Sequence, residues 1–259
     1  MSDSRKVWTW WTCLRVIAVF NVLVWAVACR PFLDRANDPD WQVTLSGIFV
    51  AVCAFRSFLP RIDLERYCLV DSPLSSMFIG RSAATVAEIC FAAQVALCLR
   101  QVGIVAHVPW IVTMSYLVVP NLMLAQCCCW YSVLTLNHLG HALEESLWAG
   151  TMALVGVCLA VAARHLQGNL FWCACGGAAL ALGFVAFMAF VDVPMYVTRW
   201  RKGRREQRAL LSLRAGVRDA LSRRIATEEW SVWRPEVAWL TGYFSVAVWL
   251  SVSLVRFSR

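Results

Sequence analysis

Long apolar runs separated by short polar segments dominate the pattern of this sequence. Each run is roughly as long as the 20 residues that a helix needs to cross a hydrocarbon layer of about 30 Å. Lipid offers the backbone no hydrogen-bond partner, so each run is expected to be a helix. We predict seven spans, at residues about 10–29, 42–59, 82–103, 107–134, 142–163, 171–198 and 236–256.

Composition supports a lipid-embedded chain over a soluble one. Hydrophobic residues make up 60% of the 259 residues and charged residues only 15%, whereas an ordinary soluble domain carries about 25% charged residues. We therefore predict an all-α integral membrane protein. Its expected form is one polytopic domain over residues 1–259, a bundle of about seven transmembrane helices with one amphipathic surface helix on the cytoplasmic side.

The basic residues predict the orientation of the chain. Of the 24 lysines and arginines, 17 lie on the side that holds the N-terminus, 6 lie on the opposite side, and Arg15 lies within the first span. Positively charged loops stay in the cytoplasm, so we predict a cytoplasmic N-terminus and a C-terminus on the opposite side, in a plasma membrane or a bacterial inner membrane. The net charge of +8 is explained by topology, and no nucleic-acid partner is expected.

The cytoplasmic loop over residues 199–235 carries the densest positive charge. Within it, apolar residues recur at helical steps among arginines, which predicts a basic amphipathic helix near residues 204–225. The apolar positions are Leu210, Leu213, Val217, Leu221 and Ile225. Such a helix suits anionic lipid headgroups, and a regulatory protein partner is the alternative.

Small residues and cysteines within the spans favour packing over chemistry. Pairs such as Ala174 with Ala178 allow a close helix contact, either inside the chain or in a homo-oligomer. Most of the 12 cysteines lie in apolar runs, where buried thiols behave as small hydrophobes. The sulfurs of the triplet over residues 127–129 point in three directions on a helix, so we expect no cysteine metal site.

Ionisable residues inside the spans are few. Glu88 and Asp192 each lie seven residues from an arginine at the cytoplasmic end of a span, or roughly 10 Å deep in a helix. The connection between the fourth and fifth spans adds polar residues on the same side, namely His138, His141, Glu144 and Glu145. Acids at membrane depth are costly and often functional, so this convergence defines one candidate site.

The local geometry of that connection has two interpretations. If it is helical, His138, His141 and Glu145 share a face. If Gly140 instead ends the fourth span as a capping residue, only His141, Glu144 and Glu145 can share one.

Imidazole and carboxylate groups together are ligands for zinc, iron or manganese. As metal ligands we name His138, His141, Glu88, Glu145 and Asp192. As catalytic acids or bases we name Glu88, Glu144, Glu145 and Asp192.

The sequence leaves three functions open. The first is a membrane-embedded enzyme that acts on a hydrophobic, lipid-like substrate through this site. The second is a proton- or cation-coupled transporter, because intramembrane acids and histidines mark such paths. The third is a noncatalytic scaffold or assembly factor, in which the acids only form ion pairs, as Glu88 could with Arg81.

Overall fold

The computed structural model describes the chain except residues 1, 34–39 and 258–259. Among the described residues, seven helices are long and apolar enough to cross a membrane. They are Asp3–Pro31, Trp41–Phe58, Met77–Val105, Pro109–Thr135, His138–Ala163, Gly168–Arg205 and Trp230–Arg256. The all-helical class and the number of apolar helices predicted from hydropathy are therefore confirmed.

The sixth and seventh of these helices are each interrupted by a π-helical turn. The sixth consists of α6 (Gly168–Phe187), η2 (Met188–Asp192) and α7 (Val193–Arg205). The seventh consists of α9 (Trp230–Gly242), η3 (Tyr243–Ala247) and α10 (Val248–Phe257). Because α7 continues to Arg205, the basic loop predicted to begin at residue 199 begins only after it.

The chain divides into two compact units, which are described separately. Unit 1 comprises residues 1–94 and 217–258, and unit 2 comprises residues 95–216. The helix α3 (Met77–Val105) contributes its first part to unit 1 and its last part to unit 2.

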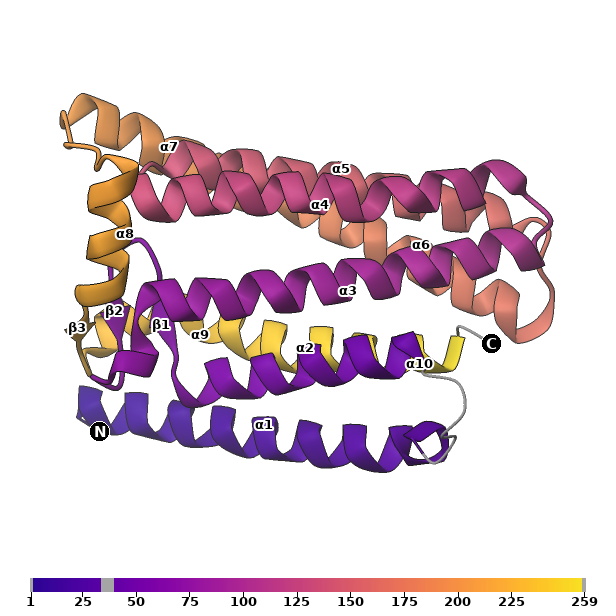
Figure 1. Ribbon diagram of the computed structural model, residues 1–259, viewed down its shortest axis with the longest axis horizontal. Helices are drawn as coiled ribbons and strands as arrows, with labels where there is room; N and C mark the ends of the chain where they lie inside the picture. The colour runs from indigo at the N-terminus through magenta and orange to yellow at the C-terminus, as the bar shows by residue number, and fades with distance from the viewer. Residues whose placement is uncertain (1, 34–39, 258–259) are drawn as a thin grey trace. The chain divides into compact units, whose positions relative to one another are not determined.

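Unit 1 is built on α1 (Asp3–Leu33) and α2 (Trp41–Phe58), which pack against each other and against the last helix of the chain (Figure 1). Burial of aromatic surface holds this unit together, because each fully buried large side chain contributes about 1.5–3 kcal/mol. Its core includes Leu14, Phe49, Trp233 and Phe244. The indole of Trp233 also donates a hydrogen bond to the carbonyl of Thr227.

A small sheet joins two loops of unit 1 at the end where α1 begins and α2 ends (Figure 1). Strand β1 (Arg61–Ile62) pairs antiparallel with β2 (Tyr67–Cys68), which pairs parallel with β3 (Ile225–Ala226). The 3-10 turn η1 (Pro73–Ser75) then leads into α3. No strand was expected from the sequence.

The amphipathic helix of the basic loop is present but shorter than predicted. It is α8 (Leu213–Ser222), where a helix near residues 204–225 was expected. Gln207 has a φ of 50°, a left-handed conformation that interrupts a helix, and Ile225 pairs in the sheet. Asp219 of α8 forms an ion pair of 2.8 Å with the fully buried Arg66, which ties the end of α8 to the turn between β1 and β2.

In unit 2, α5 (His138–Ala163) packs against α4 (Pro109–Thr135), α6 and α7. The small residues of α6 serve this packing: a Cβ placed on Gly156 of α5 would lie 3.3 Å from the Cβ of Ala181. Ala174 and Ala178 are buried on the same helix. The small-residue stripe therefore has a partner inside the unit, and a homo-oligomer stays a prediction.

The turn between α4 and α5 is short and well capped. Leu136 takes the left-handed conformation at the end of α4, and the side chain of Asn137 accepts a hydrogen bond from the backbone of Leu139 to begin α5. Gly140 consequently lies inside α5, so the alternative in which Gly140 ends the fourth helix is wrong.

Candidate metal centre

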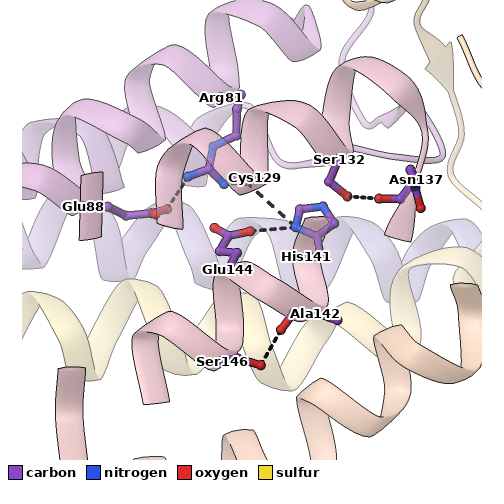
Figure 2. Close-up of polar contacts among 9 residues, drawn as sticks. All are labelled: Arg81, Glu88, Cys129, Ser132, Asn137, His141, Ala142, Glu144 and Ser146. Atoms are coloured by element: carbon purple, nitrogen blue, oxygen red, sulfur yellow. Dashed lines mark hydrogen bonds and ion pairs between the residues drawn. The ribbon is translucent and has the colours of Figure 1, made fainter. Parts of the chain in front are cut away.

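Three buried side chains of different chemical types converge in unit 2 (Figure 2). The Nδ1 atom of His141 lies 2.7 Å from Oε2 of Glu144 and 3.9 Å from Sγ of Cys129. One ligand atom from each of the three residues lies within 4.8 Å of the others. A thiol, an imidazole and a carboxylate therefore surround one point, supplied by α4 and α5.

The local sequence explains this convergence. The Asn137 cap begins α5 immediately after the turn, which puts His141 and Glu144 one helical turn apart on the same face. Gly140 lets α5 approach α4 closely: a Cβ there would lie 2.5 Å from the carbonyl oxygen of Cys128. A larger residue at this position would force the two helices apart and separate Cys129 from His141.

The hydrogen-bond arrangement differs from that of a catalytic triad. In a triad, the histidine uses one ring nitrogen for the nucleophile and the other for the acid. Here both neighbours approach the same nitrogen, Nδ1 of His141. The imidazole, the thiol and the carboxylate therefore offer three donor types to a metal ion that would bind between them.

Aromatic and charged groups surround these three residues. The ring of Tyr196 packs 5.0 Å from that of His141 and 6.3 Å from that of His138, measured between centroids. Asp192 lies within electrostatic range of His141, Glu144 and Arg199. The cluster therefore has a second carboxylate beside it.

A π-helical turn positions Asp192. Pro194 has no backbone N–H to donate and its ring disfavours a regular preceding turn, and the helix widens into the π-helical η2 just before it. Asp192 is the last residue of that turn. Such widened turns occur often at functional sites.

The structure groups some of the site residues named from the sequence. His141, Glu144 and Asp192 lie in one region of unit 2. His138 contacts Tyr196, and its Nδ1 is buried with no hydrogen-bond partner among the described residues. Glu145 is half-buried, within electrostatic range of Tyr196.

Glu88 forms an ion pair in unit 1. It lies on the unit 1 part of α3, where its Oε1 accepts a hydrogen bond of 2.7 Å from Nη2 of Arg81. Both side chains are largely buried, at 12% and 7% exposed. The structure thus gives Glu88 an ion-pair partner within its own unit.

Sequence reasoning missed Cys129. The three cysteines of the triplet do point in different directions, because Cys127 is exposed, Cys128 is half-buried and Cys129 is buried. That argument rules out a site made of all three sulfurs and does not address one sulfur that joins ligands of another helix. The signal available in the sequence was that Cys129 and His141 lie close together along the chain, on either side of the short turn between two predicted helices.

Comparison with protein families, with curated proteins and with solved structures finds no match for this chain. The function is therefore argued from the site.

Proposed function

We propose that this chain is an integral membrane enzyme that binds a zinc ion on Cys129, His141 and Glu144 and acts on a lipid-like substrate. The observation that carries the proposal is the convergence of three buried donors of different types within 4.8 Å. Buried polar groups need partners, and in this cluster the thiol, the imidazole and the carboxylate lie beside one another.

The donor types favour zinc. Cysteine sulfur, histidine nitrogen and carboxylate oxygen are all zinc ligands, whereas magnesium and calcium prefer oxygen alone. Structural zinc sites have four protein ligands, and catalytic sites have three with one position open to water or substrate. The three donors of this cluster match the catalytic arrangement.

When bound, zinc supplies a Lewis acid and an activated water at neutral pH. The side chains of the cluster then have separate tasks. His141 and Glu144 hold their donor atoms in place through the short helical turn between them, and Tyr196 packs against the imidazole ring. The carboxylate of Asp192 is the group in range to accept a proton from a substrate or water.

The position of the cluster favours a lipid-like substrate. Cys129 lies six residues before the end of α4, and His141 three residues after the start of α5, so both lie within about 10 Å of a helix end at 1.5 Å per residue. In the predicted orientation this is the cytoplasmic boundary between hydrocarbon and headgroups. A lipid would place the bonds near its headgroup at that depth.

Elemental analysis of the purified protein tests this proposal. We expect about one zinc per chain in the parent protein, because a built site of this kind binds tightly. His141→Ala and Cys129→Ser should each lose it, whereas Cys127→Ser, an exposed cysteine two residues away, should retain it. Equal metal content in Cys129→Ser and Cys127→Ser would contradict the proposal.

Transport is the second candidate, and one observation favours it. The helix that carries Asp192 is interrupted by a π-helical turn next to Pro194, and interrupted helices form ion sites in transporters. In that case Asp192→Asn would abolish proton flux in reconstituted vesicles while zinc content stays unchanged. An enzyme would show no flux in either protein.

We also propose that α8 rests on the anionic cytoplasmic leaflet. Leu213 and Leu221 are 56% and 46% exposed, and Arg214 and Arg218 are exposed beside them. Apolar side chains next to arginines suit the boundary of an anionic lipid layer. Amide exchange over α8 should be slower in nanodiscs that contain phosphatidylglycerol than in phosphatidylcholine alone, and Arg214→Gln with Arg218→Gln should remove that difference.

A further inference from the structure

Arg61 is a buried arginine outside the seven apolar helices. It lies in β1 between α2 and α3, and only 4% of it is exposed. Its Nη1 donates a hydrogen bond of 2.9 Å to the carbonyl of Ser76 and approaches the carbonyl of Leu74 at 3.5 Å. The Nη1 atom of the guanidinium is therefore hydrogen-bonded to the backbone that leads into α3.

The guanidinium is held in place by packing as well. Its Cζ lies 5.4 Å from the ring centroid of Phe55 on α2, which allows a cation–π attraction. It also packs directly on Gly80 in the first turn of α3, where a Cβ would overlap its atoms. These contacts fix the plane of the guanidinium and the direction of its remaining edge, which consists of Nε and Nη2.

That remaining edge has no protein partner among the described residues. Both Nε and Nη2 of Arg61 are buried without a hydrogen bond, and so is Oδ1 of the nearby Asp63. Burial, followed by repulsion from Arg56, lowers the pKa of Arg61 to about 10, so the group still carries its charge at neutral pH. A buried charge without an ion-pair partner is costly.

We propose that Arg61 binds a phosphate group through its Nε and Nη2 atoms. These two N–H groups form the side of the guanidinium fork that holds two oxygens of one phosphate. Arg56 in the last turn of α2 adds positive charge nearby. The site lies where α2 ends and α3 begins, which in the predicted orientation is the depth of phospholipid headgroups.

Two sources can supply this phosphate: a phospholipid headgroup or free inorganic phosphate. Because both nitrogens are buried, either ligand must displace part of the covering protein to reach them. Bound ligand should therefore stabilise the folded protein by mass action, and a thermal unfolding experiment can detect it. The site is separate from the proposed zinc ligands in sequence and belongs to unit 1.

The test measures the melting temperature of the full-length protein in detergent. The ligands are short-chain phosphatidylglycerol, inorganic phosphate, and a diacylglycerol of the same chain length as the control without phosphate. We expect a rise with phosphatidylglycerol and none with diacylglycerol if the source is a lipid. A rise with inorganic phosphate would assign the site to the free ion.

Arg61→Lys provides the residue-level test, because lysine keeps the charge and loses the planar fork. The concentration needed for half the shift should rise about tenfold or more. Arg100→Lys, an exposed arginine outside this region, should bind as the parent does. An equal response of Arg61→Lys and the parent would overturn the proposal.

A second measurement remains informative if Arg61→Lys does not fold. Native mass spectrometry of the parent protein should show a retained phospholipid that survives mild delipidation, or a phosphate adduct after inorganic phosphate is added. No phosphate-containing adduct, together with no change in melting temperature, would mean that the edge of Arg61 holds only water.

Discussion

Two buried polar groups, one in each unit, differ in their chemistry. In unit 1, the side chain of Gln94 makes three hydrogen bonds to two residues. Its Nε2 donates to the carbonyls of Gln42 and Ser251, and its Oε1 accepts a bond of 2.6 Å from the hydroxyl of Ser251. These are neutral amides and hydroxyls that bond across helices. In unit 2, Cys129, His141 and Glu144 bring three titratable donors to one point. Both groups are buried, so burial alone does not distinguish them. The donor types and their convergence are what favour the unit 2 cluster as the candidate site.

The Arg81–Glu88 ion pair of unit 1 should give the largest effect. Glu88→Gln removes the carboxylate that pairs with the buried Arg81 at 2.7 Å, and the loss of one member of a buried pair destabilises a protein by about 3–5 kcal/mol. We expect a loss of this order in the free energy of unfolding, measured by denaturation in mixed micelles, with zinc content unchanged. A stable variant that loses zinc would instead assign Glu88 to the functional site.

The amide network should give a smaller effect. Gln94→Leu removes the bonds to Gln42 and Ser251, and we expect a loss of about 1–2 kcal/mol in the free energy of unfolding. Adding Ser251→Ala should cost less than it does alone, since its partner is already gone. Strict additivity of the two substitutions would mean that the Gln94 and Ser251 side chains are not energetically coupled.

In the unit 2 cluster, substitution should lower zinc affinity and leave stability nearly unchanged. Glu144→Gln keeps a side chain of the same size that can still hydrogen-bond His141, so we expect a change in stability below about 1 kcal/mol. Zinc affinity should fall by at least about tenfold, since a charged ligand becomes a neutral amide. A large loss of stability with zinc retained would place Glu144 with the structural groups of unit 1.

An exposed contact supplies the smallest expected effect. The hydroxyl of Ser4 donates a hydrogen bond of 2.6 Å to Glu228, and this bond is the largest cause of the lowered pKa of that carboxyl. The stability that it contributes is present above the pKa of Glu228 in the unfolded chain and is lost as the pH falls through the lower folded value. Ser4→Ala should raise the folded pKa in an NMR titration, and an unchanged pKa would remove this contact from the account.

Hydropathy predicted the seven helices because length and apolar composition are properties of single segments. The polar connection before α5 is also local, because the side chain of Asn137 caps the start of that helix. The two-residue strands β1, β2 and β3 have no periodic signal, because their pairing joins segments far apart in the chain. The helix predicted near residues 204–225 was longer than α8, because Ile225 pairs in the sheet and does not continue the helix.

The candidate site was predicted in part for the same reason. His141, Glu144 and Asp192 stand out in sequence as ionisable residues among apolar ones. Cys129 does not, because it resembles the other thiols of the apolar helices until α4 and α5 are packed together. Arg61 is similar: its burial and its unbonded edge depend on the contacts with Phe55 and Gly80, which no sequence pattern indicates.

The most direct test of the proposed zinc centre is the absorption spectrum of the cobalt-substituted protein. Cobalt(II) replaces zinc in such sites, and a thiolate ligand produces a charge-transfer band in the near ultraviolet that oxygen and nitrogen ligands do not. We predict this band in the parent protein and in Cys127→Ser, and its loss in Cys129→Ser. A spectrum without the band in the parent, or with the band intact in Cys129→Ser, would contradict the account.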